Sequence, residues 1–380
     1  MADPLDVMER EIEAQGAFVP VCWRAVCEQL SAALPASLAE RVERVHLVGC
    51  GDSHQAGLAA SFAFGSWAGM RTEAHMALEF TSHHAAGLGP GDLVVPISNS
   101  GKVARTVEAA VMARGRGARV LAVTGQPEGR LAQESDAVIG TGGAQTVGLT
   151  PGTHSFVASL VTVWCLAHHL AVVRGRGDSP GIRRAESDIG RMPTLCGEML
   201  SRCRTIPEGV IDLLSSSTLI QVLGAGPAWA MAQCAQMKFL EAAAVTALPF
   251  ELEEWAHSGF FLTEPTTPLL LLAPAGRSLF RAKEIIQAAV AMGASVIAVV
   301  PDDRDAAWEK AVHVIAIPGD VDELLSPLPL ALSVQMLALH AARRLGATPL
   351  GFDSARRREV NFEQIFGSEI RCEPPGGVGE

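Results

Sequence analysis

The chain has 380 residues, of which 48% are hydrophobic and 19% are charged, and its formal net charge is −11. This length suffices for two domains with separate cores, and the hydrophobic content excludes a largely disordered chain. The negative charge excludes a nucleic-acid-binding surface, so an anionic ligand needs a local binding device such as a helix N-terminus.

The cysteine pattern and the apolar segments indicate the cellular compartment of the protein. Eight cysteines are scattered without a CxxC pair or zinc-like spacing, so we expect buried thiols in a reducing cytoplasm, no metal and no cofactor. The N-terminus lacks the basic start and apolar core of a signal peptide. The longest apolar stretch, 156–173, is interrupted by His168 and His169 and is too short to span a bilayer comfortably. The sequence predicts a cytoplasmic protein without a membrane or nucleic-acid partner.

The chain contains an internal sequence repeat. After a helical lead-in over 1–43, a strand at 45–48 runs into Gly49-Cys50-Gly51, and 175 residues later a strand at 219–223 runs into Gly224-Ala225-Gly226. The next strand in each copy leads to a glycine at the same offset, Gly101 and Gly276. A third pair, 117–123 and 293–299, matches with an offset of 176. Repetition at a fixed period indicates that one structural unit is used twice.

Within each copy, apolar runs alternate with segments of helical periodicity, such as 103–114 and 279–291. Strands that are apolar on both faces and separated by helices indicate a parallel sheet covered on both sides. We therefore predict an α/β protein with two doubly wound, flavodoxin-like lobes in tandem. The predicted boundaries are 44–173 for the first lobe, 174–205 for a linker, 206–345 for the second lobe and 346–380 for a C-terminal tail.

The most informative turn of the first lobe is Ser98-Asn99-Ser100-Gly101, between a strand and a helix. Two hydroxyls and free backbone N–H groups there face the positive end of a helix, at the sheet edge where ligands bind. This pattern favours a phosphate cradle over a simple helix N-cap, and Lys102 can add positive charge. Gly49-Cys50-Gly51 lacks the third glycine of a dinucleotide-binding turn, so nicotinamide binding is not expected.

The second lobe has Ala273-Pro274-Ala275-Gly276 at the equivalent turn and therefore lacks the serines. It carries instead Lys238 and Glu241, one helical turn apart, followed by an acidic stretch that ends at His257. Residues at this spacing share a helix face. The spacing alone also fits a surface ion pair and a structural histidine.

At these residues the chain resembles the sugar isomerase (SIS) family, in particular the isomerase half of glutamine–fructose-6-phosphate aminotransferase, and related phosphosugar deglycases and deaminases. The resemblance covers nearly the whole chain. The motifs that carry it are Met8-x-x-Glu11-Ile12-x-x-Gln15, Gly49-Cys50-Gly51-x-Ser53, Ser98-x-Ser100-Gly101 and Thr153-x-Ser155-Phe156. The family's catalytic glutamate, the lysine three residues before it and the histidine sixteen residues after it match Glu241, Lys238 and His257.

The resemblance implies roles for these residues. Glu241 is the base that moves a proton between C1 and C2, and we expect partial burial to raise its pKa towards neutrality. His257 is the proton shuttle for ring opening and reaches a neighbouring subunit's site, which implies a homodimer with shared active sites. Arg356 takes the place of a closing lysine in the tail. The implied substrate-binding residues are Cys50, Gly51, Asp52, Ser53, Ser98, Asn99, Ser100, Gly101, Lys102, Thr153 and Arg356.

The chain also departs from the family. Val103 stands where relatives commonly have threonine, and Asp52 stands where they have a neutral residue. One hydroxyl fewer and one carboxylate more both weaken the case for a standard phosphate site. The chain opens at the isomerase portion, so we expect no amidotransferase domain with an N-terminal nucleophilic cysteine.

Three functions for a protein that binds a small anionic sugar remain open. The first is an isomerase-type enzyme that acts on an amino-sugar phosphate and releases or adds the amine. The second is a deglycase of phosphorylated fructosyl-amino acids, which uses the same base and acid. The third is a non-catalytic sugar-phosphate sensor, which has no need of glutamate and histidine at catalytic spacing.

Overall fold

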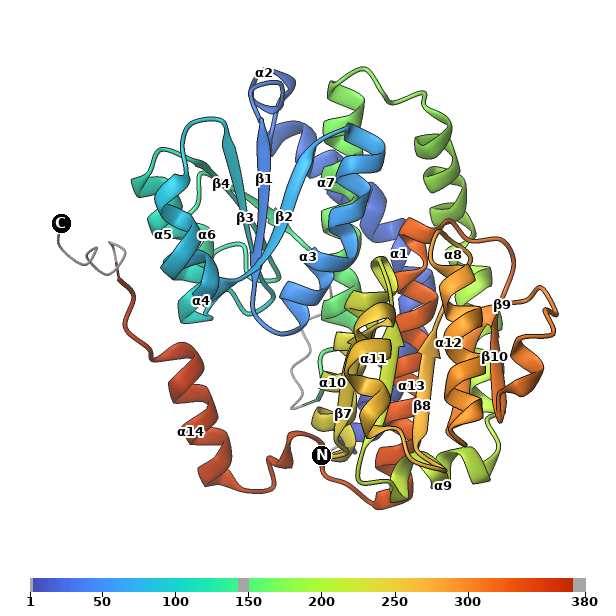
Figure 1. Cartoon of the computed structure of the whole chain (residues 1–380). Helices are drawn as coiled ribbons and strands as arrows, with labels where there is room; N and C mark the ends of the chain where they lie inside the picture. The colour runs from blue at the N-terminus through green and yellow to red at the C-terminus, as the bar shows by residue number, and fades with distance from the viewer. Residues whose placement is uncertain (1–2, 143–149, 372–380) are drawn as a thin grey trace. The chain divides into compact units, whose positions relative to one another are not determined.

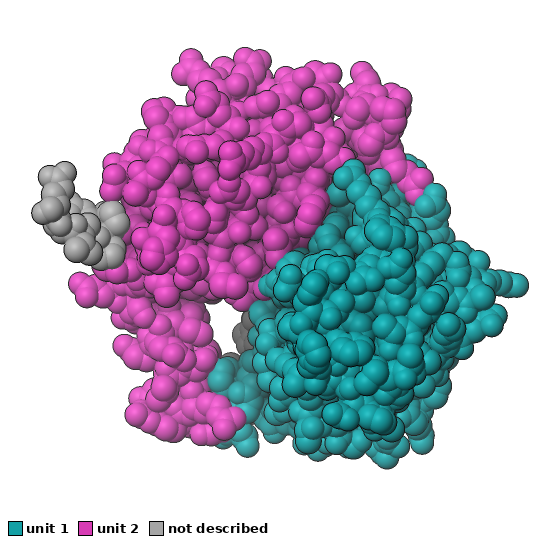
Figure 2. All heavy atoms as spheres, viewed as in Figure 1, with its two compact units in different colours: residues 1–18, 146–153, 187–353 teal, residues 19–145, 154–186, 354–380 magenta. Residues whose placement is uncertain are grey.

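The computed structural model describes residues 3–142 and 150–371. The chain forms two compact units. Unit 1 comprises Met1–Phe18, Thr146–Thr153 and Ser187–Asp353, and unit 2 comprises Val19–Gln145, His154–Glu186 and Ser354–Glu380 (Figure 2). Unit 2 contains the sheet of the first predicted lobe and unit 1 that of the second, while helices α1 (Pro4–Ala33) and α8 (Pro180–Arg204) each contribute residues to both units.

Unit 2 is built on a parallel sheet with the strand order β2-β1-β3-β4-β5 (Figure 1). The strands are β1 (Arg44–Gly49), β2 (Arg71–Met76), β3 (Asp92–Ser98), β4 (Arg119–Thr124) and β5 (Ala137–Gly140). Every residue of β3 is buried, as expected for a central strand covered on both faces.

The two faces of this sheet are covered by different helices. Gly57 of α3 (Asp52–Ala63) lies against Leu47 and Ile97 on one face. Val107 of α5 (Ala104–Gly115) belongs to the core cluster that contains Val48 on the other face. The remaining elements of unit 2 are α2 (Ala36–Ala39), α4 (Ala77–Glu79), α6 (Arg130–Gln133), α7 (His154–Val173), α14 (Ala355–Phe366), the π-helical turns η1 (Phe64–Ala68) and η2 (Phe80–His84), and the 3-10 turn η3 (Ala85–Gly87).

Unit 1 repeats this architecture in the order β7-β6-β8-β9-β10. The strands are β6 (Ile220–Gly224), β7 (Ala247–Glu251), β8 (Pro268–Leu272), β9 (Ser295–Pro301) and β10 (His313–Ile317). The helices are α9 (Glu208–Ser216), α10 (Pro227–Ala243), α11 (Leu252–His257), α12 (Leu279–Ala291) and α13 (Pro327–Leu345), with 3-10 turns η4 (Gly259–Leu262), η5 (Trp308–Lys310), η6 (Glu323–Leu325) and η7 (Pro349–Gly351). Both sheets have the flavodoxin-like order 2-1-3-4-5 when numbered within the unit. The predicted fold class is confirmed.

The same glycine-dependent turn follows the first strand of each unit. Gly51 has φ 53° and ψ −130°, and Gly226 has φ 58° and ψ −132°, a conformation that side chains with a Cβ rarely adopt. A Cβ at Gly49 would lie 2.8 Å from the backbone nitrogen of His54, and one at Gly224 would lie 2.4 Å from the carbonyl oxygen of Ala228. The helix after each first strand therefore packs directly against the strand end.

Two helical segments, His154–Val173 and Glu323–Leu345, are long and apolar enough to cross a membrane. In the structure, 78% and 89% of their most apolar windows are buried. This degree of burial is that of core helices in a globular domain, and length and composition alone are weak evidence for a membrane span.

We predict that Gly224→Ala lowers the free energy of unfolding by about 1–3 kcal/mol, because the added methyl group overlaps the backbone of α10. Chemical denaturation measures the change. Gly190→Ala is the matched control: it lies in α8 of the same unit, has no neighbouring atom within 4 Å of the new Cβ, and should be neutral or stabilising. Equal stability of Gly224→Ala and the wild type contradicts the close packing described here.

Candidate functional site

The turn after β3 is held by backbone hydrogen bonds. The N–H of Gly101 donates to the carbonyl of Ser98 at 3.0 Å, and the N–H of Gly125 donates to the carbonyl of Asn99 at 3.1 Å. The carbonyl of Gly101, whose φ is 62°, accepts from the N–H of Leu131 at 3.0 Å. These bonds tie the turn to the loops after β4, so its hydroxyls are presented on a rigid backbone.

A cavity of about 230 Å³ opens beside this turn in unit 2. It is lined by Cys50, Asp52, Ser53, Ser98, Asn99, Ser100, Val103, Ser155, Phe156 and Ser159. The structure thus brings together six of the predicted substrate-binding residues, from the turns after β1 and β3. The volume is below the ~300–1,000 Å³ of typical small-molecule sites, so the cavity suits one anionic group and its nearest carbons rather than a whole sugar.

The polar groups of this cavity are suited to an anion. Ser98 is 2% exposed, and among the described residues its Oγ has no hydrogen-bond partner. Val103 is the N-cap residue of α5 and makes no side-chain capping bond, so the first N–H groups of this helix are not capped by its own side chain. An unpaired buried hydroxyl and an uncapped helix N-terminus are both satisfied by a bound anion.

Two residues of the cavity set limits on its chemistry. Cys50 is exposed as a residue, but desolvation of its sulfur raises the pKa of the thiol, which accepts a hydrogen bond from Thr106 at 3.9 Å. Asp52 is the first residue of α3 and brings a carboxyl group to the cavity lining. A carboxylate there opposes a second anion at close range, which makes Asp52 better suited to a sugar hydroxyl than to a phosphate.

The sequence analysis named Ser155 and Phe156 only as part of a family motif and did not predict that α7 lines the cavity. Ser155, Phe156 and Ser159 line it although they lie more than fifty residues after the serine turn. A detectable signal was present, because Ser155 and Ser159 lie four residues apart and therefore on one helix face.

The cations near the turn do not line the cavity. Lys102 is exposed, and its backbone N–H contacts Ser100 Oγ at 3.3 Å. Arg105 binds the buried carboxylate of Glu108 at 2.5 Å and the carbonyl of Glu369. Arg371 also donates its backbone N–H to Glu108 at 2.9 Å. Arg105 therefore fixes the C-terminal segment of unit 2 to α5.

The predicted catalytic pair lies on α10 of unit 1. Lys238 is fully buried, and its Nζ lies 2.7 Å from Oε2 of Glu241, whose side chain is 32% exposed. An ammonium group favours the ionised form of a neighbouring carboxylate, which is the form that accepts a proton. The buried lysine and half-exposed glutamate are unlike a solvated surface ion pair.

Hydrogen bonds to Gln221 of β6 hold the helix that carries His257. Gln221 of β6 accepts hydrogen bonds from Trp255 at 2.8 Å and Thr263 at 3.0 Å, and it donates one to the carbonyl of Gly259 at 2.9 Å. These bonds hold α11 at Trp255 and the turn after it at Gly259 and Thr263. His257 itself is the last residue of α11, its side chain is 73% exposed, and its Nε2 lies 3.6 Å from Glu253.

Unit 1 has no open cradle at the turn equivalent to Ser98–Gly101, because one of its own carboxylates fills that position. Glu323 accepts the backbone N–H of Arg277 at 3.0 Å, and a Cβ at Gly276 would lie 2.2 Å from its Oε1. The remaining cavity at this turn is about 10 Å³. The turn of unit 1 thus lacks the serines, and the carboxylate of Glu323 occupies the place where an anion could bind.

The other predicted substrate-binding residues lie outside the cavity lining. Thr153 belongs to unit 1, where its buried hydroxyl donates to Glu11 at 2.5 Å. Arg356 is exposed on α14 and pairs with Glu359 at 3.0 Å. Gly51 and Gly101 shape the two turns through their positive φ angles.

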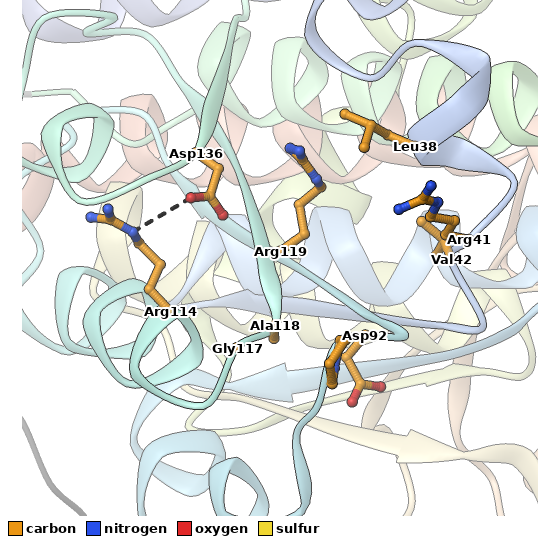
Figure 3. Close-up of a pocket in the computed structure, with 10 residues that line it drawn as sticks. Leu38, Arg41, Val42, Asp92, Arg114, Gly117, Ala118, Arg119 and Asp136 are labelled. Carbon is orange, nitrogen blue, oxygen red and sulfur yellow. Dashed lines mark ion pairs between the residues drawn. The ribbon is translucent and has the colours of Figure 1, made fainter.

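A larger cavity of about 480 Å³ lies at the opposite, amino-terminal edge of the unit 2 sheet, where β3 begins with Asp92 and β4 with Arg119 (Figure 3). Arg114, which also lines it, pairs with Asp136 at 3.6 Å (Figure 3). Ligands of open α/β sheets bind at the carboxyl edge of the strands, so we place the candidate site at the smaller cavity.

Comparisons with known proteins identify the family of the first lobe. A family model described as the SIS domain matches residues 38–169. A glutamine–fructose-6-phosphate aminotransferase of Gloeobacter violaceus is 30% identical over 314 residues, which is 82% of this chain and 51% of that protein. The chain spans about half the length of the curated relatives it matches.

Solved structures share the fold. The C-terminal domain of glucosamine-fructose-6-phosphate aminotransferase from Francisella tularensis superposes with a TM-score of 0.79 at 21% identity, covering 90% of this chain and 97% of that chain. Glucosamine-6-phosphate deaminase from Thermotoga maritima superposes with a TM-score of 0.70 at 20% identity, covering 90% and 96%. Residues 38–169 therefore form a domain of the SIS family, and the chain has two lobes of this fold in tandem.

Proposed function

We propose that the protein is an aldose–ketose isomerase-type enzyme that acts on an amino-sugar phosphate and releases or adds the amine. The observation that carries the proposal is the hydroxyl-lined cavity at the start of α5, in which Ser98 Oγ is buried and has no partner among the described residues. The relatives named above act on, or are named for, phosphorylated fructose and glucosamine.

In the proposed reaction, the carboxylate of Glu241 takes a proton from the carbon next to the carbonyl or imine and returns it to the adjacent carbon. The intermediate is an enediol or an enolamine, and no net oxidation occurs. The C2 imine formed from an amino aldose is then hydrolysed by water, which breaks the C–N bond, leaves the ketose carbonyl and releases the amine; addition of the amine is the reverse. Lys238 holds Glu241 through their 2.7 Å contact and is a positioning residue. His257 moves the ring-oxygen proton when the sugar opens, because imidazole exchanges protons near neutral pH.

Substrate binding is divided among three groups in this proposal. Ser98, Ser100 and the N-terminus of α5 bind the phosphate, and Asp52 accepts a hydrogen bond from a sugar hydroxyl or an amine. Arg356 closes over the sugar. A hydroxyl or protonated amine is the better partner for Asp52, because either can donate a hydrogen bond to the carboxylate.

The proposal includes a homodimer that works in the cytoplasm. His257 is 73% exposed at the end of α11, where a partner subunit can reach it. In the part of the chain that the structure describes, none of the seven cysteines is in a disulfide, as in proteins of reducing compartments. Cys372 lies outside the described residues.

A deglycase of phosphorylated fructosyl-amino acids remains the second candidate, because the same base and the same cavity serve both reactions. The two differ in the leaving amine. A panel of 6-phosphorylated amino sugars and fructosyl-amino acids separates them by which amine appears, and a sensor binds members of the panel without turning any over.

We predict that Glu241→Gln lowers kcat by about 10²–10⁴-fold on the substrate found in this panel, because the amide cannot accept the proton. Ammonia or amine release measures the rate. Glu254→Gln, at an exposed position of α11, is the matched control and should retain wild-type turnover. Undiminished release by Glu241→Gln refutes Glu241 as the base.

We further predict that Ser98→Ala raises the dissociation constant of the same phosphorylated compound by about 10–100-fold, the cost of losing one hydrogen bond to a charged group. Isothermal titration calorimetry measures this change. Ser278→Ala, at the equivalent turn of unit 1 beside Glu323, is the control and should bind as the wild type does. If Ser98→Ala binds the compound as tightly as the wild type does, this turn is not part of the binding site.

A further inference from the structure

Three metal-ligating side chains meet at the edge of the unit 2 sheet, away from the residues that line the serine cavity. His46 lies on β1, and Glu73 and His75 lie on the neighbouring edge strand β2. The parallel register sets His46 opposite Glu73 and Val48 opposite His75. Residues opposite one another or two apart along a strand project from the same sheet face, so all three side chains share one face.

The distances within this group are those of a metal site. His46 Nδ1 lies 3.3 Å from His75 Nε2, and Nε2 of His75 lies 3.5 Å from Glu73 Oε2. One ligand atom from each residue lies within 4.8 Å of the other two. Two nitrogens bound tetrahedrally to zinc at about 2.0–2.1 Å are separated by roughly 3.3 Å, so the two imidazoles already have the required spacing.

Asp92 orients His46 for such a role. Its Oδ1 lies 3.2 Å from His46 Nε2, and because a carboxylate only accepts, the proton is on Nε2 and the lone pair of Nδ1 faces His75. Arg44 holds Asp92 through contacts of 2.7 and 2.9 Å, and the N–H of Gly89 adds a third bond of 2.8 Å. A carboxylate behind a ligating histidine is the usual support of a metal-bound imidazole.

The ligand types also fit, because imidazole nitrogens and a carboxylate oxygen are common ligands of divalent transition metals. Glu73 contacts Arg71 at 3.1 Å, but Arg71 is largely exposed and Glu73 only half-buried, so this pair is weak and can release Glu73.

We propose that His46, Glu73 and His75 bind one divalent transition-metal ion, with Zn²⁺ the best match for two imidazoles and a carboxylate. The site joins the edge strand β2 to β1. A fourth position is open to water or to His84, whose ring centroid lies 4.6 Å from that of His75. The ion has a structural role here, because the site uses none of the residues assigned to sugar binding or proton transfer.

The test uses the full chain after dialysis against a chelator. Zn²⁺ titrated in competition with a chromophoric chelator should bind at one equivalent, and Zn²⁺ should raise Tm. His75→Ala and Glu73→Gln should each weaken binding by at least about tenfold and reduce the Tm shift. His313→Ala, which removes a half-buried strand histidine of unit 1, is the matched control and should bind Zn²⁺ as the wild type does.

Co²⁺ provides the second readout, since thiolate ligands add strong near-ultraviolet charge-transfer bands that imidazole and carboxylate ligands lack. A visible Co²⁺ spectrum without those bands, lost in His75→Ala, supports the site. Circular dichroism shows whether His75→Ala still folds. If it does not, Glu73→Gln still tests the site, because it changes a half-buried side chain. Absence of binding, binding unchanged in Glu73→Gln, or thiolate bands that persist in both variants overturns the proposal.

Discussion

The arrangement of both units depends on a backbone turn that tolerates no side chain. Gly49 and Gly224 let the following helix pack against the end of the first strand, and Gly51 and Gly226 then turn the chain with nearly equal φ and ψ angles. Because the strands are parallel, the turns after β1 and β3 meet at one edge of the sheet. This geometry brings Cys50–Ser53 and Ser98–Ser100 into one cavity, although the two segments are more than forty residues apart in sequence.

The two copies of the turn have diverged by changes in a few side chains. In unit 2, the hydroxyl of Ser98 is buried at the uncapped start of α5, which leaves room and hydrogen-bonding capacity for an anion. In unit 1, Glu323 supplies a carboxylate to the same position and the cavity is nearly closed. The residues that we propose for proton transfer lie in unit 1 on α10, where buried Lys238 contacts Glu241. In this proposal, the two copies of one topology carry different groups, hydroxyls in unit 2 and a lysine–glutamate pair in unit 1.

The repeat, the parallel α/β lobes and the serine turn could be predicted because each depends on local patterns: apolar runs, glycine positions and hydroxyls before a helix. Contacts between distant segments could not be predicted in this way. Lys102 follows the serine turn in sequence but does not line the cavity, whereas Ser155 and Ser159 reach it from α7. Glu323 fills the second turn from a segment 46 residues farther along. The group of His46, Glu73 and His75 depends on the register between two strands, which spacing along the chain does not reveal.

The central claim is that this chain shifts a proton between adjacent carbons of a phosphorylated sugar with Glu241 as the base. Solvent deuterium exchange tests it directly, because exchange requires only proton abstraction and not the correct leaving amine. Proton NMR of fructose 6-phosphate and glucosamine 6-phosphate in D₂O should show loss of the C1 or C2 signal with the wild type, and Glu241→Gln should abolish this loss. Exchange that persists in Glu241→Gln, or no exchange of either sugar although it binds, contradicts the account.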